Sequence, residues 1–450
     1  MKLTLPDSLI ALANEFAPDS LYAVGGFVRN SLMGSGETDI DICSYLLEGQ
    51  IRAKNIDGLV IKPVNPRIGT LKLIYMGGEF EYTTFRYDNY PSDGRHTPDR
   101  VVFTRDIEAD AKRRDFTVNA VYYDIGKEEF IDPVSGMADI RAGILRTADA
   151  ADKTLSEDGL RILRMVRFAV SYDLIIYNET LAAAKHYVKL LSDISKERIR
   201  DEFLKILYAD AGGMKDAHYK GLLLLDDIGA FPYIIPYLSD TKGAEQNTKY
   251  HLYDVFNHIL MTVRYSPPEV RLAALFHDIA KPICRRKYGN NYLHSPIGSD
   301  IVYEVLGANG LKFTKSETAR VAQLVKLHMY DIDMRASDDR LRIFVQHHYY
   351  MIDGLIALKR ADYKAKGLTV GESPSVIRIA HLYDDMKAEG VPFAVCDLLV
   401  NGLDLSRLGY RYKEIGDGLK NLLTACANDL TLLTREAQLR FCEENRKELK

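Results

Sequence analysis

Short runs in which apolar and polar residues alternate dominate the first part of the chain, up to about residue 145. A period of two places every second side chain on one face, as in a strand with one buried face. Glycine, proline, aspartate and asparagine residues separate these runs, as expected for turns. The predicted strands are LVIKPV, TLKLIYM, FEYTTFRY, RVVFT and VNAVYYDI. Ahead of them, MKLTLPDSLIALANEF has the spacing of a short amphipathic helix.

The period of the apolar positions changes near residue 156. In SEDGLRILRMVRFAVSY, Leu160, Leu163 and Val166 follow helical spacing, and Ser156 is the predicted N-cap with acids in the first turn. Helical patterns then continue to the end of the sequence. We therefore expect a head of mixed α and β structure followed by an extended all-α body.

The composition is that of a folded globular protein. Of the 450 residues, 47% are hydrophobic and 27% are charged, which excludes a disordered chain. No apolar run approaches the length that spans a bilayer, and the N-terminal segment does not have the pattern of a signal peptide. The net charge of −4 indicates that any polyanion site must come from local clustering. Five scattered cysteines without metal-site spacing indicate reduced thiols and a cytoplasmic protein.

The candidate chemistry begins with two aspartates in YAVGGFVRNSLMGSGETDIDIC, residues 22–43. Asp39 and Asp41 are two positions apart on a predicted strand, so both carboxylates face one way while Ile40 and Ile42 face the core. Two adjacent carboxylates repel each other, and a divalent cation removes that cost. Mg²⁺ prefers carboxylate oxygens together with substrate phosphates.

Glycines and an arginine precede the two aspartates. Gly25 and Gly26 let backbone N–H groups approach a phosphate, just before a helix predicted to begin near Phe27. Arg29 would add a guanidinium group that can bind a phosphate through two hydrogen bonds. A paired glycine or a D-x-D alone is common on protein surfaces. Together they predict metal-assisted phosphoryl or nucleotidyl transfer.

In this order, GGFVRNSLMG and DIDI resemble the signature of the class II tRNA nucleotidyltransferases, the family of the CCA-adding enzymes and the bacterial poly(A) polymerases. The resemblance implies a nucleotidyltransferase head in which Asp39 and Asp41 hold the catalytic Mg²⁺. The family usually has aspartate where this chain has Asn30. This substitution leaves the two metal-binding aspartates intact. It removes a negative charge at position 30 and so changes any charged contact made from there.

Two further segments are similar to later parts of the same family. FEYTTFRYDNYPSDGRHTPDRVVFT, residues 80–104, looks like the strand and loop after the first motif and makes Glu81 a candidate third carboxylate; a solvated strand acid is the alternative. KRRDFTVNAVYYD, residues 112–124, is similar to the second motif. It implies that Arg114 and Asp115 contact the sugar and phosphates of a nucleotide, whereas a solvated basic cluster is the alternative.

Asp158 and Arg161 lie three positions apart and so share a face of the predicted helix. They form either a local ion pair or, as the resemblance implies, a protein template that reads the bases of CTP and ATP. Arg164 continues along the same helix. In SKERIRDEFLKIL, Arg198 is the expected nucleotide-facing or phosphate-facing residue, with a charged solvated helix as the alternative.

A second constellation begins at residue 251, in HLYDVFNHIL, LAALFHDIAKP, LHSPIGSD, LVKLHMY and KRADYKAKG. Burying an acidic side chain beside a histidine costs free energy unless both side chains bind a ligand such as a metal ion. His258, His277, Asp278 and Asp362 are a sufficient ligand set for one divalent metal, and His294 and His328 could bring a second. The segments resemble the HD phosphohydrolase family, which implies a divalent metal of unknown identity. Lys281 follows the His-Asp pair and could meet a substrate phosphate.

Over nearly the whole chain, the resemblance implies a CCA-adding enzyme with a C-terminal HD domain. Its substrates would be CTP, ATP and tRNA, to whose 3′ end it would join CMP, CMP and AMP. The expected domains are a head over 1–145, a nucleotide-selecting and RNA-binding neck over 146–225, an HD domain over 226–370 and a tRNA-binding tail over 371–450.

Three other functions stay open at this point. A poly(A) polymerase and an enzyme that adds only CC or only A belong to the same class, and Asp93 and Arg95 in the 80–104 loop favour A addition. An HD phosphohydrolase with a nucleotide-sensing head is the alternative of another class. The HD region itself is expected to hydrolyse a phosphate on a damaged tRNA end or, alternatively, to use its metal only as a structural staple.

Overall fold

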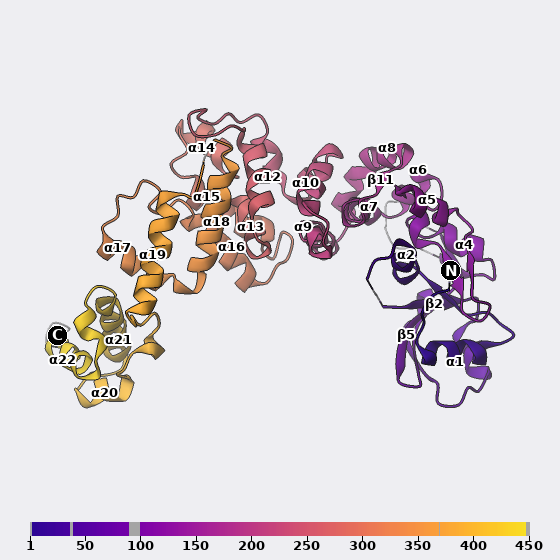
Figure 1. The fold of residues 1–450 in the computed structure, drawn as a ribbon, viewed down its shortest axis with the longest axis horizontal. Helices are drawn as coiled ribbons and strands as arrows, with labels where there is room; N and C mark the ends of the chain where they lie inside the picture. The colour runs from indigo at the N-terminus through magenta and orange to yellow at the C-terminus, as the bar shows by residue number, and fades with distance from the viewer. Residues whose placement is uncertain (1, 37–38, 90–99, 369, 447–450) are drawn as a thin grey trace. The chain divides into compact units, whose positions relative to one another are not determined.

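A computed structural model describes residues 2–36, 39–89, 100–368 and 370–446 (Figure 1). The chain divides into two compact units, Met1–Ile234 and Ile235–Lys450. The first unit contains the sheet and the second is helical, which confirms the predicted head of mixed structure and the helical body. In the described ranges, no helix has the length and apolar character needed to cross a membrane.

A seven-stranded sheet forms the centre of the head, with the strand order β3-β4-β5-β2-β1-β8-β9. Its strands are β1 (Tyr22–Val24), β2 (Asp41–Ser44), β3 (Val60–Asn65), β4 (Thr70–Tyr75), β5 (Gly78–Thr84), β8 (Tyr122–Asp124) and β9 (Glu129–Ile131). β2 and β5 run parallel, and the other neighbours are antiparallel. β6 (Arg86–Asn89) and β7 (Arg100–Phe103) form a separate antiparallel pair.

The alternation in the sequence explains which face of the sheet is buried. In β4, Leu71 and Leu73 are buried, and in β5 Phe80 and Tyr82 are buried. These side chains join one apolar core with residues of α1 (Asp7–Phe16) and α2 (Gly26–Met33). The predicted N-terminal helix and the helix after the paired glycines are therefore present.

The helix predicted from residue 156 onward is two helices. α6 (Ala151–Glu157) ends before Asp158, and α7 (Leu160–Ser171) begins after Gly159. The prediction of Ser156 as an N-cap was wrong, because Ser156 lies in the last turn of α6. Asp158 is extended, and its carboxylate accepts a hydrogen bond from the Leu160 backbone N–H at 3.0 Å. The break thus places Asp158 at the start of α7.

The other helices of the first unit are α3 (Glu48–Ala53), α4 (Ile107–Lys112), α5 (Gly136–Ala142), α8 (Asn178–Tyr187), α9 (Lys196–Leu207), α10 (Ala217–Asp227) and α11 (Phe231–Ile234). The remaining described strands are the short parallel pair β10 (Ile144–Leu145) and β11 (Ile175–Ile176).

The second unit consists of helices and short 3₁₀ turns. Its helices are α12 (Val255–Tyr265), α13 (Arg271–Phe276), α14 (Lys281–Tyr288), α15 (His294–Leu306), α16 (Lys315–Leu327), α17 (Asp338–His347), α18 (Ile352–Ala365), α19 (Pro374–Ala388), α20 (Gly402–Arg407), α21 (Lys413–Cys426) and α22 (Arg435–Asn445). The last three pack around their own small core, which includes Leu405, Tyr410 and Leu422.

Candidate functional site

The head sheet gathers carboxylates beside the glycine turn. Asp41 is the first residue of β2, and the parallel register places it opposite Glu81 on β5. Asp39 lies just before the strand and is exposed, while Ile42 is buried in the core and Ile40 packs against it. Gly25 has a φ of +78°, and a Cβ on this glycine would lie 3.3 Å from an Asp41 carboxylate oxygen. The turn therefore brings backbone directly against the carboxylate.

The electrostatics of Asp41 fit a cation site. Desolvation, the neighbouring charge of Glu81 and, more weakly, that of Asp39 raise the pKa of the Asp41 carboxyl, while Arg114 opposes the rise. A divalent cation would relieve this repulsion between like charges. The three donors are all carboxylates, which suits a hard ion such as Mg²⁺.

A cavity of about 590 Å³ opens beside Asp41 and is strongly basic. Among the described residues, seven arginines and three aspartates line it. They are Arg29, Arg113, Arg114, Arg161, Arg164, Arg167, Arg198, Asp41, Asp115 and Asp158, together with Gly25, Gly26, Asn119, Leu160, Phe168 and Tyr172. An excess of guanidinium groups in a confined space favours a polyanion such as a triphosphate.

Arg29 is buried and held by neutral partners. Its Nε and one Nη donate to the Asn30 side-chain oxygen at 3.1 and 2.8 Å, and the other Nη donates to the Asn119 side-chain oxygen at 2.5 Å. A further bond goes to the Tyr172 hydroxyl at 2.5 Å. Asn30 thus positions Arg29 without neutralising it, and in the part of the chain that the structure describes no carboxylate contacts this guanidinium directly.

Two further arginines of the cavity share a buried carboxylate. Asp110 accepts from Arg113 Nε at 2.7 Å and from Arg114 at 3.1 Å, and the Tyr122 hydroxyl donates to it at 2.7 Å. Burial opposes ionisation, but Arg113 and Arg114 lower the pKa of Asp110 to about 2. Asp110 therefore remains charged and fixes both guanidiniums at the cavity.

Both carboxylate oxygens of Asp115 accept hydrogen bonds from protein side chains. One of its oxygens accepts from Arg164 Nε and Nη at 2.8 and 2.6 Å, and the other accepts from the Asn119 side chain at 3.0 Å. Burial opposes ionisation, but Arg164 and Asn119 lower the pKa of Asp115 to about 2. In this structure the carboxylate orients Arg164.

Asp158 and Arg161 both line the cavity. Each is held there by a contact with a residue far away in the sequence. Arg198 on α9 donates to the Asp158 carboxylate at 2.9 Å, so that α7 and α9 are linked at this point. Arg161 donates to the backbone carbonyls of Thr154 and Arg113, each at 2.9 Å, and to Glu157 at 3.3 Å. These contacts hold a carboxylate and a guanidinium at the same cavity, each through partners of its own.

Several residues that line the cavity or support its arginines were missed from the sequence. The spacing of Asp110, Arg113 and Arg114 on one helical turn was a signal that could have found Asp110. Asn119 and Tyr172 carry no local signal, because their contacts with Arg29 cross 90 and 143 residues of the chain. Asp93 and Arg95, which favoured A addition, lie outside the described residues.

The second unit contains a buried cluster of histidines and aspartates. Two triads bring their ligand atoms within 4.8 Å of one another: His258, His277 and Asp362 in one, and Asp278, His294 and His328 in the other. His277 and Asp278 lie in the turn after α13, and the other four come from α12, α15, α18 and the end of α16.

Asp278 belongs to the second triad and also contacts the first. One of its oxygens is 3.3 Å from His277 Nε2, and the other is 3.3 Å from His294 Nε2. Lys281 contacts the first of these oxygens at 2.5 Å and also donates to Gln246 at 2.8 Å. A carboxylate in this position can bridge two metal ions.

Backbone carbonyls orient the four imidazoles. The Nδ1 atoms of His277, His294 and His328 lie 2.8, 2.6 and 2.7 Å from the carbonyls of residues 274, 291 and 325, and His258 Nδ1 lies 3.4 Å from that of residue 365. With Nδ1 protonated, each Nε2 lone pair faces the cluster. Two such Nε2 pairs are 3.3 Å apart, a contact that favours a bound cation.

The protonation states also suit metal binding. Burial opposes ionisation of Asp278, but His277 and Lys281 hold the pKa of its carboxyl well below the usual range. Burial and the facing rings of His277 and His294 lower the pKa of His328 to about 3. At His277 burial opposes protonation, but Asp278 and Asp362 raise the pKa on balance, so a metal ion would displace a proton from this imidazole. Ionised aspartate and neutral histidine are the forms that ligate metals, so the donor set fits one or two divalent ions.

Three domain families match the chain in succession. Residues 21–146 match the family described as the poly(A) polymerase head domain. Residues 173–241 match the family described as the probable RNA and SrmB-binding site of polymerase A, and residues 248–383 match the HD domain. The paired aspartates thus lie in the first region, and the histidine cluster lies in the third. The nucleotide cavity is lined by residues of the first region, by residues 158–172 between the first and second regions, and by Arg198 of the second.

Relatives in sequence are named CCA-adding enzymes. That of Lactobacillus johnsonii is 38% identical over 188 residues, which cover 41% of this chain and 45% of the relative. That of Geobacillus kaustophilus is 36% identical over 216 residues, covering 47% of this chain and 50% of the relative. The chain therefore spans about half the length of the curated relatives that it matches.

Solved structures show the same fold over nearly the whole chain. The Bacillus stearothermophilus CCA-adding enzyme in complex with CTP has a TM-score of 0.66 and 21% identity, and the comparison covers 99% of both chains. The Thermotoga maritima CCA-adding enzyme complexed with tRNA has a TM-score of 0.57 and 21% identity, with 98% of this chain and 95% of the other covered. As the motifs predicted, a region that matches the poly(A) polymerase head domain is followed along the chain by a region that matches an RNA-binding domain and by one that matches the HD domain.

Proposed function

We propose that this protein is a CCA-adding tRNA nucleotidyltransferase, which adds CMP, CMP and AMP from CTP and ATP to the 3′ end of tRNA without a nucleic-acid template. The observation that carries the proposal is the arginine-lined cavity that opens beside Asp41, where Glu81 and Asp39 add two further carboxylates. It combines a polyanion site with a divalent-cation site within the first unit of the chain.

The residues that line the cavity or lie beside it divide by role. Asp39, Asp41 and Glu81 would hold Mg²⁺, which when bound offsets the charge of the triphosphate and lowers the pKa of the attacking hydroxyl. Gly25 and Gly26 present backbone N–H groups at the start of α2.

Arginines of the cavity bind the phosphates. Arg29 is fixed by Asn30 and Asn119 and keeps an unneutralised charge, and Arg114 is fixed by Asp110. Because these side chains are already oriented, little side-chain entropy is lost when the phosphates bind. The 3′-hydroxyl oxygen of the RNA attacks the α-phosphorus, the bond to the bridging oxygen breaks, and pyrophosphate leaves.

Base selection falls to Asp158 and Arg161, with Arg198 holding Asp158 in place. The carboxylate offers acceptors and the guanidinium offers donors, so together they can read the hydrogen-bonding edge of cytosine or adenine. Arg164, held by Asp115, lies along the same helix and faces the same cavity.

The identity of the acceptor rests on the relatives. Proteins named CCA-adding enzymes match this chain in sequence, and CCA-adding enzymes bound to CTP, to ATP and to tRNA share its fold. We propose the same partners here and keep the division into head, neck, HD domain and tail at 1–145, 146–225, 226–370 and 371–450. The five free thiols support a cytoplasmic location.

A single assay tests the proposed reaction. Purified protein is incubated with Mg²⁺ and a tRNA transcript that lacks its 3′ CCA, with each labelled nucleotide alone and with CTP and ATP together. We expect two additions with CTP and a third only when ATP is also present, whereas Asp41→Ala should fold normally and add nothing.

Other outcomes would select another function. A long tail made from ATP alone would show a poly(A) polymerase, and products that stop at CC or need a preformed CC end would show a partial enzyme. Nucleotide binding without incorporation would favour a nucleotide-sensing head.

A second proposed activity belongs to the HD domain. Two ligand triads, both contacted by Asp278, support hydrolysis of a phosphate ester, because a metal-bound water is deprotonated more readily than free water. We propose a phosphate or 2′,3′-cyclic phosphate on a damaged tRNA end as the substrate class. Clearing such an end would expose the hydroxyl that the head requires.

The HD proposal is tested with small phosphate esters. Wild-type protein is screened with Mg²⁺, Mn²⁺, Co²⁺ and Ni²⁺ on a cyclic and a monoesterified phosphate. Asp278→Ala should abolish hydrolysis and leave addition to intact tRNA nearly unchanged. If the wild type hydrolyses neither ester with any of these metals, the metal serves only to staple the helices.

A further inference from the structure

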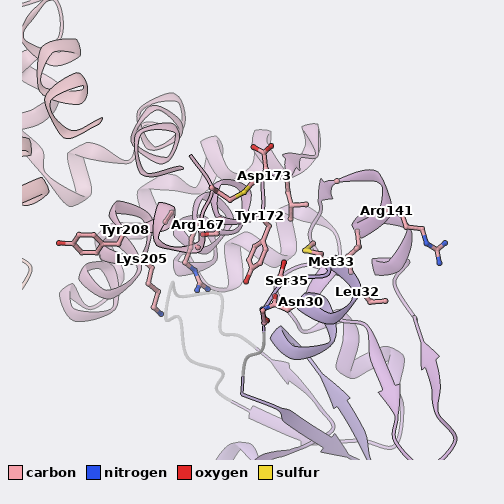
Figure 2. A pocket seen from close by; sticks show the side chains of 18 of the residues that line it. Asn30, Leu32, Met33, Ser35, Arg141, Arg167, Tyr172, Asp173, Lys205 and Tyr208 are labelled. Atoms are coloured by element: carbon pink, nitrogen blue, oxygen red, sulfur yellow. The ribbon is translucent and has the colours of Figure 1, made fainter. Parts of the chain in front are cut away.

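A second cavity of the first unit measures about 1070 Å³, and Asn30, Ser35 and Lys205 are among the residues that line it (Figure 2). Arg167 and Tyr172 line both this cavity and the nucleotide cavity. The two spaces therefore adjoin, and the second cavity belongs with the proposed nucleotidyl transfer site. A buried group to which neither proposed reaction assigns a role lies in the second unit.

This group is Lys359, a lysine in the middle of α18 that is only 4% exposed. Burying an ammonium group costs free energy unless its N–H donors find partners. Lys359 Nζ donates to the backbone carbonyl of His328 at 3.2 Å and to that of Tyr330 at 2.7 Å. In the described part of the chain, its direct partners are thus backbone carbonyls and not carboxylates. The lysine therefore holds the short segment from His328 to Tyr330.

That segment is the C-terminal end of α16. The helix ends at Leu327, and His328 is its C-cap. The last carbonyls of a helix have no partner within the helix, so the end frays unless other groups cap it. A lysine that donates to these carbonyls also interacts favourably with the helix dipole. Lys359 therefore caps α16 from another helix, at the residue whose imidazole belongs to the second ligand triad.

The same lysine lies on the helix that supplies a ligand to the first triad. Lys359 and Asp362 are three positions apart on α18 and so share a face of that helix. Asp362 belongs to the first triad, and its carboxylate lies 2.9 Å from His258 Nε2. One side chain thus connects the helix that carries Asp362 to the helix end that carries His328.

We propose that Lys359 is a positioning residue of the HD metal site, which fixes His328 relative to Asp362 by capping α16. The inference rests on the proposed metal-binding function of the HD domain. Without this cap the end of α16 would fray, and the His328 imidazole would leave its place opposite His294, where the two Nε2 atoms are 3.3 Å apart. Metal affinity at the second triad would fall, whereas the helices that carry the first triad would keep their contacts.

The experiment measures binding of Co²⁺ to the metal-free full chain by calorimetry. All proteins carry Asp41→Ala, which removes the proposed metal site of the head. Lys359→Met removes the donors and keeps a long side chain, and Lys359→Gln keeps N–H donors on a shorter one. Gln346→Met is the matched control, because Gln346 is 1% exposed in α17 of the same unit and also donates to two backbone carbonyls, those of Pro392 and Leu423, at 2.8 and 2.7 Å.

We expect the Kd of one bound Co²⁺ to rise at least tenfold in Lys359→Met and several-fold in Lys359→Gln, because loss of a group that holds a metal ligand in place typically costs about 10–100-fold in affinity. Gln346→Met should leave Co²⁺ binding unchanged. Both methionine variants leave two buried carbonyls without a donor, so a general loss of stability would appear in both. Hydrogen exchange without metal should show faster exchange in the last turn of α16 in Lys359→Met alone.

Equal Co²⁺ affinity in Lys359→Met and Gln346→Met would overturn the inference, and so would unchanged exchange at the end of α16. If Lys359→Met does not fold, Lys359→Gln decides the question, and unchanged affinity in that variant refutes the positioning role. The result does not depend on hydrolysis of any ester, because metal affinity is measured. If the parent protein binds no Co²⁺, the proposed HD metal site itself fails, and the inference fails with it.

Discussion

Replacing Asp110 by asparagine should loosen the wall of the nucleotide cavity that carries Arg113 and Arg114. The Asp110 carboxylate is fully buried, and besides the two arginines and the Tyr122 hydroxyl it accepts from the Arg86 backbone N–H at 3.2 Å. Asparagine keeps the shape but removes the negative charge, and it puts an NH₂ group where an oxygen accepted hydrogen bonds.

The size of the effect follows from the pKa of Asp110. Its value of about 2 lies below the ordinary 3.8 even though burial acts in the opposite direction. That difference corresponds to about 2.5 kcal/mol in favour of the charged form. Removing one partner of a buried ion pair typically costs about 3–5 kcal/mol. We therefore expect Asp110→Asn to destabilise this region by roughly 3 kcal/mol.

Hydrogen exchange measures this loss locally, which is needed because a chain of two units does not unfold in one step. At about 1.4 kcal/mol per tenfold, a loss of 3 kcal/mol should speed amide exchange in α4 and β8 by roughly 150-fold. Asp106→Asn is the matched control. Asp106 caps the same helix by accepting from the Glu108 backbone N–H, a role that asparagine fills equally well.

The dependence on pH has a definite sign. Because the folded pKa of Asp110 is lower than the unfolded one, its stabilisation is complete above about pH 4 and is lost as the pH falls toward 2. Wild type and Asp110→Asn should therefore differ at neutral pH and converge in acid. Equal exchange in the two proteins at pH 7 would refute the view that Asp110 fixes these arginines.

Three further changes probe the two sites. Gly25→Ala should cost about 1–3 kcal/mol through its positive φ and should also slow addition through its contact with Asp41, measured by hydrogen exchange of the first turn of α2 and by the addition assay. Gly34→Ala, at a φ of +67° with open space around it, should cost stability but leave addition unchanged. Arg161→Ala should reduce the preference for CTP and ATP over UTP and GTP, since a bidentate base contact is worth about 1–3 kcal/mol, with little change in tRNA affinity; full retention of selectivity would leave Arg161 a structural role. Asp278→Asn should lower the number of bound metal ions per chain in mass spectrometry of metals, because its oxygens face both triads, and unchanged metal content would contradict the bridging position.

The sequence by itself determined the local secondary structure. The alternation in TLKLIYM and FEYTTFRY predicted β4 and β5, and paired glycines before an apolar helical run predicted α2. Such patterns depend on neighbours a few residues apart, so they can be read without the fold. The motif order also predicted the head, the RNA-binding region and the HD domain, and this was confirmed by the family matches.

Contacts between distant segments were decided only by the tertiary structure. Arg29 is held by Asn119 and Tyr172, Asp158 is paired with Arg198, and Asp278 faces histidines from separate helices. No local spacing encodes these pairs. Ser156 shows the same limit within a single segment, because the helix breaks where Asp158 binds the Leu160 backbone and Gly159 packs closely against the Leu190 side chain. The physical reason is that the sequence fixes which groups carry charge, whereas burial and long-range packing decide which of those charges are paired internally and which face a cavity.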